Sequence, residues 1–328
     1  MPQTFRDLIA ANKRNSVLLV VCFILFVAIV AMVIGLAIVA YYSPGTVARL
    51  NVLRALVIGA IAGVLAFLVA LLGYYSGDDM ILAVSQARRI QHKDDPELFN
   101  IVEEMAIAAG LPMPRVYVIR DKSPNAFATG RDPEHASIAV TTGLREKLNR
   151  EELQGVIAHE MSHVQNYDIR LMLLMAVLVG TVVMLADLFW QITWYTSPGS
   201  ARESKSDRDG KDGGGGGIIA LVLIVLAVLL AIIAPLLAQL IQLAVSRQRE
   251  YLADATAVQL TRNPLGLAQA LRKIDEDPAE LKSANRGTAH LYIANPIKKY
   301  EARAHSAFAS HPPIKDRIRR LERLAHQG

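Results

Sequence analysis

Cysteine is almost absent from this chain of 328 residues, and charged residues are scarce. The only cysteine, Cys22, lies inside a long apolar run. An intrachain disulfide is therefore excluded, and a metal site in a polar region must use histidine and carboxylate ligands. Charged residues make up 20% of the chain, whereas about 25% is usual for a soluble domain. This deficit, together with long uncharged runs, predicts an integral membrane protein.

Further absences narrow the class of protein. The net charge of +5 is small and suits attraction to an anionic membrane leaflet. Aromatic and basic residues are not interleaved as they are on RNA-binding surfaces, so we expect no nucleic-acid partner. No clear cleavage site follows the first apolar run, which is longer than the ~7–15 residues usual in a signal peptide. The first run is therefore predicted to remain as a membrane anchor.

Four apolar runs are long enough to cross a membrane as helices. A helix needs about 20 residues to span a hydrocarbon core ~30 Å thick. The fourth run exceeds this length and contains Pro235, so we expect it to kink or to project beyond the lipid. In the second run Gly59 and Gly63 have the GxxxG spacing typical of close helix packing. The predicted transmembrane helices cover residues 17–40, 55–73, 171–194 and 218–245.

Basic residues beside the first two spans predict the orientation of the chain. Such residues accumulate on the cytoplasmic side of a membrane. They precede the first span and follow the second, so residues 1–16 and 76–170 are expected in the cytoplasm. The residues concerned are Arg6, Lys13, Arg14, Arg88, Arg89 and Lys93.

The third and fourth spans are joined by residues 195–217, which are rich in glycine, serine and aspartate and predict a flexible loop. The balanced charges of this loop carry no information on orientation. An even number of spans then returns residues 246–328 to the side of residues 76–170. The sequence therefore predicts an α-helical membrane protein with four transmembrane helices and one cytoplasmic domain made of two polar blocks.

The first polar block predicts a helix, a small sheet and a second helix. Apolar residues at helical spacing predict a helix over 96–112, which Gly110 and Pro112 end. Asn149 and Glu152 form a capping-box pattern at the start of the second helix. Short β-branched and aromatic runs predict an antiparallel sheet of residues 115–120, 126–130 and 137–143.

The second polar block predicts three helices. They cover residues 246–260, 265–274 and 313–324, and Asn263–Pro264 separates the first two. The basic residues of the last helix are most simply a solvated face, with contact to lipid headgroups as the alternative. These residues are Lys315, Arg317, Arg319, Arg320 and Arg323.

The pattern His159-Glu160-x-x-His163 lies on the second predicted helix of the first block. Side chains four residues apart share one face of a helix, so His159 and His163 can bind one metal ion. Glu160 can then reach a water molecule beside the metal without being a ligand itself. Such a short pattern also arises by chance, but its place on a capped amphipathic helix favours a metal site.

A catalytic zinc ion needs a third protein ligand and an open position for water. No histidine follows His163 at the short spacing that some zinc sites use. Glu250 is the candidate, and Asp254 one turn later is placed to accept the free ring N–H of a ligand histidine. The predicted hairpin of two spans returns the chain to the same membrane face. The alternative for Glu250 is a solvated charge at a helix end, beside Arg247 and Arg249.

Four segments in combination resemble the HtpX family of membrane-embedded zinc endopeptidases, which is related to the CAAX prenyl proteases. They are HEMSH (159–163), SRQREYLADA (246–255), PNAFATG (124–130) and SHPPIKDRI (310–318). The resemblance covers most of the chain, including the number and order of the spans. It implies a gluzincin-type α+β domain, mainly α-helical, with one zinc ion, in the inner or plasma membrane of the cell. It also implies quality control of misfolded membrane proteins.

The resemblance assigns roles to individual residues of this chain. Matched to the family pattern, His159, His163 and Glu250 bind zinc, and Glu160 is the general base. Asp254 completes the family-like E-x-x-x-D pairing with Glu250.

Two more residues are candidates for the reaction. His311, which precedes Pro312–Pro313, is predicted to stabilise the oxyanion or to block the zinc in a resting form. The alternative is a histidine in a surface loop. Asn125, after Pro124, is predicted to lie beside an edge strand that pairs with an extended substrate. The alternative is an ordinary turn asparagine.

The sequence therefore predicts a membrane-bound zinc endopeptidase whose substrates are misfolded or damaged polypeptides. Zinc would activate a water molecule, and Glu160 would move its proton to the leaving amine. A non-catalytic membrane scaffold with a structural zinc ion is the alternative, and it would need a closed site with four protein ligands. A small-molecule transporter is disfavoured, because the spans contain almost no paired charges and no inverted repeat.

Overall fold

The structure is a computed structural model that covers most of the two polar blocks and the first two spans. The third predicted span is described only in its first part. The predicted loop, the fourth span and His311 lie outside the described residues. The structure describes residues 5–42, 48–178, 180–181, 247–281, 288–294, 296 and 312–327.

The chain forms two compact units. Met1–Leu19, Leu72–Val177 and Gln239–Gly328 make the first unit, and Val20–Leu71 and Leu178–Ala238 make the second. The N-terminal flank and both polar blocks thus belong to one unit, although the predicted spans separate them in the sequence.

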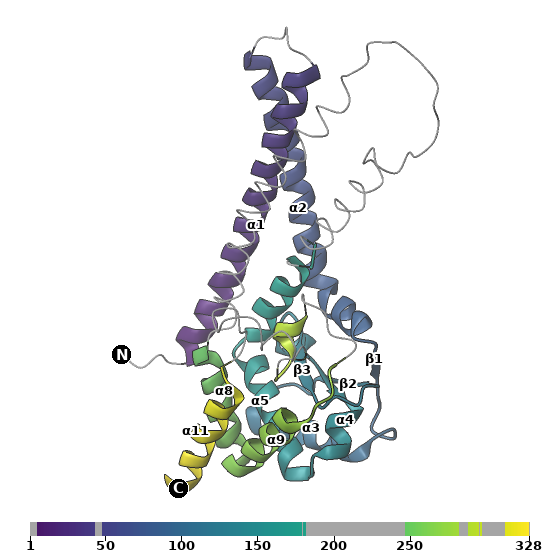
Figure 1. Ribbon diagram of the computed structural model, residues 1–328, viewed down its shortest axis with the longest axis vertical. Coiled ribbons are helices and arrows are strands. Elements are labelled where there is room, and N and C mark those ends of the chain that lie inside the picture. Colours follow the sequence, from purple (N-terminus) through teal and green to yellow (C-terminus); the bar gives the residue numbers. More distant parts are fainter. Residues whose placement is uncertain are drawn as a thin grey trace, which may run out of the picture. The chain divides into compact units, whose positions relative to one another are not determined.

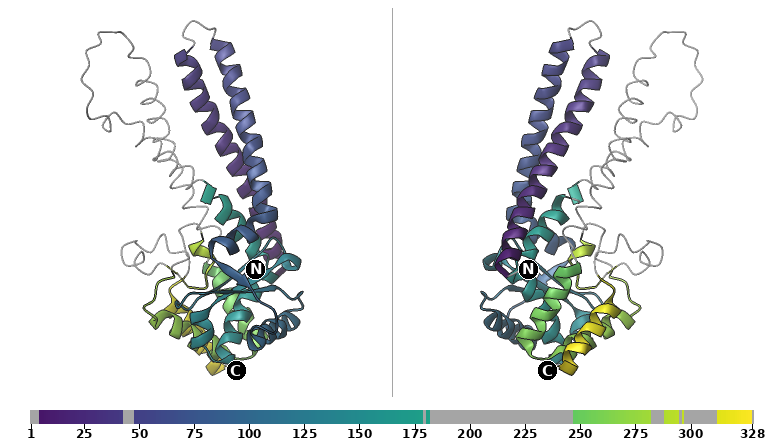
Figure 2. Two further views of the ribbon diagram at one scale, coloured as in Figure 1. Left: turned by 90° about the vertical axis from the view of Figure 1, so that its right-hand side faces the viewer. Right: turned by 90° about the vertical axis from the view of Figure 1, so that its left-hand side faces the viewer.

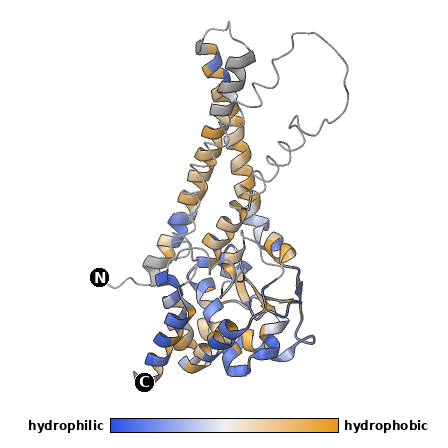
Figure 3. Cartoon of the chain, viewed as in Figure 1, coloured by the Kyte–Doolittle hydropathy of each residue, from blue (hydrophilic) through white to orange (hydrophobic). Residues whose placement is uncertain are grey.

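Two long helices, α1 (Phe5–Tyr42) and α2 (Ala48–Val84), run through the second unit and continue into the first. Their stretches Ile9–Met32 and Leu50–Val84 are long and apolar enough to cross a membrane. By length and composition they agree with the first two predicted spans, and both helices extend beyond the predicted limits. Apolar residues occupy most of their length (Figure 3).

In the second unit α1 and α2 lie side by side (Figure 1, Figure 2). They expose large apolar side chains such as Val64, which is 60% exposed, and lipid accepts such a surface whereas water does not. A Cβ added at Gly59 would lie 2.9 Å from the Ala28 carbonyl oxygen and 3.0 Å from Met32 Cβ. The helices therefore approach closely at Gly59, as its spacing from Gly63 predicts.

The first unit contains a sheet of four strands: β1 (Ala87–Arg89), β2 (Arg115–Ile119), β3 (Ala126–Thr129) and β4 (Ser137–Thr141). Their order is β1-β2-β4-β3. β2 and β4 are parallel, whereas the other two pairs are antiparallel. The prediction of an antiparallel sheet is therefore wrong at the central pair. The chain passes from β2 to the far edge to form β3 and returns through a short 3-10 helix, η1 (Pro133–His135), which leaves β4 parallel to β2.

The described helices around this sheet include the predicted ones, together with two short helices that were not predicted, residues 142–147 and 289–291. They are α3 (Pro96–Ala109), α4 (Thr142–Lys147), α5 (Arg150–Gln165), α8 (Arg247–Thr261), α9 (Pro264–Glu276) and α11 (Ile314–Gln327), with the 3-10 helix η3 (Ala289–Leu291). Helix α3 ends at Gly110, whose φ of 64° is the left-handed conformation that glycine accepts most easily. Helix α5 begins with the predicted capping box between Asn149 and Glu152.

Helix α5 is the centre of the first unit. It packs against α3, α8 and α9 and against strand β3, and Figure 1 shows it between the strands and helices α8 and α11. Leu98 of α3, Ile138 of β4, Val156 of α5 and Leu271 of α9 belong to one buried apolar core. Polar side chains of α5 that enter this interior must have hydrogen-bond partners or bind an ion, because water cannot reach them.

A second apolar cluster covers the opposite face of the sheet. Tyr117 and Phe127 point into it from β2 and β3. Ile81 near the end of α2, Leu173 in the helical residues 168–178 and Tyr292 beyond η3 complete the contact. The sheet is therefore covered on both faces, which is why most of its residues are buried.

Candidate active site

The candidate metal-binding and catalytic residues lie on helix α5 and its neighbour α8. His159, Glu160 and His163 of α5 are all buried, and so are Glu250 and Asp254 of α8. The histidines lie one helical turn apart, and the two acids of α8 are spaced in the same way. Because α5 and α8 pack directly against each other, the structure brings both pairs to one place inside the first unit.

One nitrogen of each histidine and the Glu250 carboxylate form a triangle. His159 Nε2 lies 3.2 Å from His163 Nε2 and 3.6 Å from Glu250 Oε2. His163 Nε2 lies 3.6 Å from Glu250 Oε1. A tetrahedral zinc ion about 2.0–2.2 Å from each ligand separates its ligand atoms by about 3.4 Å. The triangle therefore has the size that one zinc ion needs, and these three residues could hold such an ion.

The second ring nitrogen of each histidine lies beside an aspartate. His159 Nδ1 is 3.0 Å from Asp254 Oδ1, and His163 Nδ1 is 3.0 Å from Asp168 Oδ2. Each carboxylate can hold the tautomer that carries its proton on Nδ1 and offers the Nε2 lone pair to a metal. Asp168 is a residue that the sequence reasoning missed. Its position five residues after His163, just beyond the end of α5, is the signal that could have identified it.

Arg317 of α11 is fully buried beside the triangle, so the prediction of a solvated basic face is wrong at this residue. Its Nε and Nη2 donate to the two Asp254 carboxylate oxygens, at 2.9 Å and 2.7 Å. Its Nη1 lies 3.3 Å from Glu250 Oε2 and donates to the Ile293 carbonyl oxygen 3.0 Å away. The planar guanidinium makes these bonds at once, which a lysine could not do.

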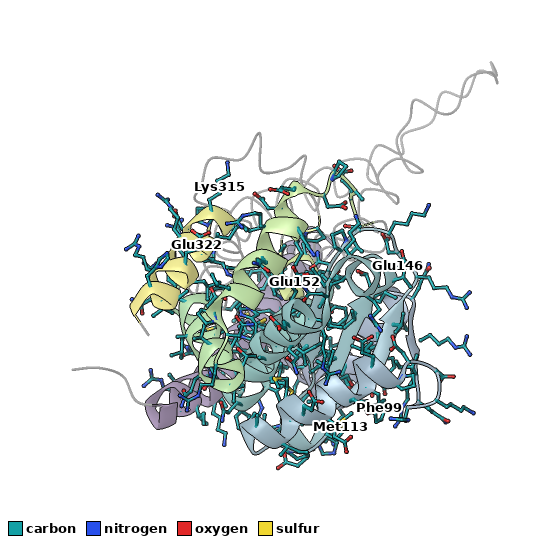
Figure 4. All side chains as sticks on the ribbon, turned by 90° about the horizontal axis from the view of Figure 1, so that it is seen from below. Phe99, Met113, Glu146, Glu152, Lys315 and Glu322 are labelled. Atoms are coloured by element: carbon teal, nitrogen blue, oxygen red, sulfur yellow. The ribbon has the colours of Figure 1, made fainter. Side chains whose placement is uncertain are left out.

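The position of Arg317 along α11 indicates that its side chain is buried. Ile318 and Leu321 are buried on the inner face of this helix, and Arg317 lies one residue before the first and four before the second. It therefore belongs to the apolar face rather than the solvated one. Lys315, by contrast, points outward from α11 (Figure 4) and is exposed. The solvated reading thus fits Lys315 and fails for Arg317.

The surroundings of His159 and His163 shift their pKa values in opposite directions. Burial lowers the pKa of His159 to about 4, and the positive charge of Arg317 acts in the same direction. Burial alone would lower the pKa of His163 as well, but its hydrogen bond to Asp168 and the charge of Glu250 raise it to about 9. His159 is therefore neutral and ready to bind a metal at pH 7, whereas His163 must release a proton when a metal binds.

Glu160 lies between the histidines and strand β3. The backbone of Ala128 in β3 hydrogen-bonds to its carboxyl group. Its Oε1 is buried and has no hydrogen-bond partner among the residues that the structure describes. Burial raises the pKa of Glu160 to about 7, against the opposing charge of His163. A carboxyl group with a pKa near neutrality and one available oxygen can both accept and release a proton.

Asn125 precedes β3 and binds the segment that follows η3. Its Nδ2 donates to the Ala294 carbonyl oxygen at 3.0 Å, and its Oδ1 accepts from the Ala126 N–H at 3.1 Å. The Ile293 N–H donates to the Ala126 carbonyl oxygen at 3.0 Å. Since Arg317 also binds the Ile293 carbonyl, this segment links the start of β3 to the histidine–carboxylate cluster.

Known proteins match nearly the whole chain. Residues 92–325 match the family described as Peptidase family M48. A protein called Protease HtpX homolog from Lactobacillus helveticus is 43% identical over 316 residues, which cover 96% of this chain and 98% of the relative. A homolog of the same name from Dictyoglomus thermophilum is 42% identical over 326 residues, covering 99% of this chain and 97% of the relative. The crystal structure of S. mikatae Ste24p matches with a TM-score of 0.45 and 18% identity, over 89% of this chain and 62% of that one.

Proposed function

Because the chain belongs to peptidase family M48 and is a membrane metalloprotease, we propose that it is a zinc-dependent endopeptidase with one zinc ion per chain. We assign His159, His163 and Glu250 as the zinc ligands and Glu160 as the general base. The observation that carries this assignment is the triangle of ligand atoms, which all lie within 4.8 Å of one another.

The donor atoms suit zinc rather than a harder cation. Two imidazole nitrogens and one carboxylate oxygen are a ligand set typical of catalytic zinc, whereas calcium and magnesium prefer oxygen ligands alone. A zinc ion held there would lower the pKa of the attacking water and polarise the scissile carbonyl group. Three protein ligands leave a fourth position open, as hydrolysis requires.

The residues of this chain supply the proton transfers. Glu160 takes one proton from the attacking water as the water oxygen bonds to the scissile carbonyl carbon. It passes that proton to the leaving nitrogen as the C–N bond breaks, so that a carboxyl group and an amine are released. Burial raises the pKa of Glu160 and a bound zinc ion would lower it, so the carboxylate can take up the proton and then return it.

The surrounding residues hold the ligands in place. Asp254 and Asp168 orient the two imidazole rings through their Nδ1 atoms. Arg317 in turn fixes Asp254 and compensates the charge of Glu250. Each ligand is thus oriented by a partner that is itself hydrogen-bonded, which supports a site with a fixed geometry.

We propose that an extended substrate pairs with the outer edge of β3 around Ala128, beside Glu160, because the outward groups of Ala126 are already bonded to Ile293 and Asn125. Asn125 would support this substrate edge from the start of β3, where it fastens the segment at Ala294. His311 stands six residues before Arg317 in the sequence, and we propose it as a hydrogen-bond donor to the oxyanion.

For the membrane topology, we propose four spans with the N-terminus and the catalytic domain in the cytoplasm. The N-terminal flank and both polar blocks belong to one compact unit, and segments of one compact unit must share a side of the membrane. Asn12 before the first span donates to Asp168 before the third at 2.7 Å. This proximity supports an even number of spans between the polar segments, and the basic residues beside the spans support the cytoplasmic side.

We propose misfolded or damaged membrane proteins of the inner or plasma membrane as the substrates. The apolar run of residues 171–194 begins only a few residues after His163, so the metal-binding helix is close in the chain to a membrane span. The printed names of the relatives, Protease HtpX homolog, agree with a peptidase function. A site attached so closely to a membrane segment is suited to polypeptide at the membrane face.

The substitution Glu160→Gln tests the assignment of the general base. Glutamine keeps the shape of the side chain but cannot accept the proton, so zinc should stay bound while cleavage falls at least about 100-fold. The assay is cleavage of an unfolded model protein by the purified full-length chain in detergent with zinc. Glu151→Gln, at the exposed start of the same helix, is the matched control and should cleave like the parent. Full activity in Glu160→Gln would overturn the proposal.

The alternative function, a non-catalytic scaffold with structural zinc, predicts a different metal environment. X-ray absorption of the zinc-loaded parent should show three protein ligands and one light-atom ligand from solvent if the site is catalytic. Four protein ligands, together with no cleavage by the parent, would favour the scaffold instead.

A further inference from the structure

The N-terminal end of α1 contacts the turn that follows the metal-binding helix. Asn12 is 2% exposed, and its Nδ2 donates to the Asn166 carbonyl oxygen at 2.8 Å and to Asp168 Oδ1 at 2.7 Å. Asn166 is the C-cap of α5, two residues before Asp168. One side chain of α1 thus binds the turn at both of its ends.

The turn itself has an unusual backbone. Tyr167 has a φ of 59°, in the left-handed region that residues with a Cβ rarely adopt. Its ring lies under the Lys13 ammonium group, 4.4 Å from the ring centroid, and also contacts the Arg170 guanidinium at 5.0 Å. Contacts from α1 therefore accompany a turn conformation that the local sequence does not favour on its own.

The turn presents Asp168 to a metal ligand. The two oxygens of Asp168 have different partners, because Oδ2 faces His163 Nδ1 at 3.0 Å while Oδ1 accepts from Asn12. Arg249 Nε forms an ion pair with the same oxygen at 3.7 Å, which is beyond hydrogen-bonding distance. Asn12 thus gives Oδ1 its short, directional hydrogen bond, and Arg249 adds the longer ion pair.

We propose that Asn12 is a positioning residue for the metal ligand His163, so that the first membrane helix is a structural part of the metal site. The inference rests on the proposed function, because it takes His163 to be a zinc ligand. Asn12 acts through Asp168: the amide fixes one carboxylate oxygen, and the other oxygen fixes the imidazole with Nε2 toward the metal. Helix α1 is continuous from Phe5 to Tyr42, so the same helix carries this contact and the first apolar run.

The proposal is tested by zinc affinity, which does not depend on turnover. The zinc dissociation constant of the purified full-length protein in detergent is measured by competition with a chelating dye. Asn12→Ala should weaken zinc binding about 3- to 10-fold, the net worth of one typical hydrogen bond. Asp168→Ala should weaken it about 10- to 100-fold. Ser16→Ala is the matched control, since Ser16 is buried one turn along α1 and its Oγ bonds to the Asn12 carbonyl oxygen. It should bind zinc like the parent.

A second variant guards against a simple failure to fold. Asn12→Asp keeps the shape of the side chain but places a carboxylate against Asp168, so zinc binding should weaken more than in Asn12→Ala. The visible absorption of the cobalt-substituted protein should change in both Asn12 variants and not in Ser16→Ala. At saturating zinc, both Asn12 variants should lower kcat and leave KM unchanged, because the substrate edge is untouched.

The outcomes separate the inference from the function on which it rests. Zinc affinity and cobalt absorption of Asn12→Ala equal to those of the parent would overturn the positioning role, even if its metal-free melting temperature fell. A His163→Ala variant that bound zinc as tightly as the parent would overturn the zinc-site assignment, and the inference with it.

Discussion

Replacement of Arg317 by methionine should cost the first unit more stability than any exposed substitution on the same helix. The guanidinium is fully buried and lies against two buried carboxylates, Asp254 and Glu250. Methionine fills a similar volume but leaves both acids without this cation. Loss of one partner of a buried ion pair costs about 3–5 kcal/mol. For a unit of about 150–250 residues, at about 2–4 °C per kcal/mol, the melting temperature should fall by roughly 6–20 °C.

Thermal unfolding of the full-length protein in detergent measures this loss, and a chelator keeps the metal from contributing. Arg319→Met is the matched control. Arg319 lies two residues along α11, pairs with Asp316 and has a side chain that is 66% exposed, so its loss should change stability by less than about 0.5 kcal/mol. A melting temperature for Arg317→Met within about 2 °C of the control, under 1 kcal/mol for a unit of this size, would refute the reasoning.

The same substitution has a defined pH dependence. Burial alone would raise the pKa of Asp254, but the charge of Arg317 and their hydrogen bonds hold it below its usual value. A carboxylate with a lowered pKa stabilises the fold at neutral pH and loses this contribution as the pH falls through that value. In Arg317→Met the contact with His159 still lowers the pKa of Asp254, but the charge and hydrogen bonds of Arg317 are gone, so Asp254 should take up a proton at higher pH than in the parent. The stability difference between the parent and the variant should therefore shrink as the pH falls.

Further predictions address the metal and the packing of its helix. Saturating zinc at about 1,000 times its dissociation constant should stabilise the parent by about 4 kcal/mol, so chelation should lower the melting temperature by roughly 8–16 °C and zinc should restore it. Asp254→Asn should weaken zinc binding about 10- to 100-fold in dye competition, because the amide cannot replace the carboxylate partner of His159. Gly155→Val should lower the melting temperature by roughly 2–12 °C through overpacking of about 1–3 kcal/mol. A Cβ at Gly155 would lie 2.8 Å from the backbone nitrogen of Leu267, which cannot move aside as a side chain can.

Local sequence patterns correctly predicted the helix ends that are set by residues close together in the sequence. The capping box at Asn149 and the left-handed glycine at Gly110 end or begin helices through contacts within a few residues, and both are present in the structure. The sheet was predicted less well. The alternation of side chains along a strand indicates a strand but does not say whether it pairs in parallel or antiparallel. β2 and β4 are parallel neighbours because β3 takes the outer edge, where it packs on α5.

In the histidine–carboxylate cluster, too, some residues could be predicted from local spacing and others depend on distant parts of the chain. His159 and His163 share a helix face, so their proximity follows from spacing alone, whereas Glu250 could be proposed only with the predicted hairpin of two spans and its match to the family pattern. Arg317 was assigned to solvent because its charge outweighed its position on the apolar face of α11. A helix face is defined by position rather than by residue type, and a buried arginine is stable only because Asp254 and Glu250 are already there to receive it.

Asn12 could not have been found in this way. In the sequence it is one polar residue before an apolar run, where a residue in contact with water or headgroups is expected. Its burial depends on the turn at Tyr167, which belongs to another part of the chain and adopts a left-handed backbone there. The sequence of neither the start of α1 nor the turn at Tyr167 predicts this contact, since an amide and a carbonyl can bind many partners. The contact exists because the unit that holds the proposed metal ligands also includes the start of α1, and this makes the helix of the first predicted span a testable part of the proposed zinc site.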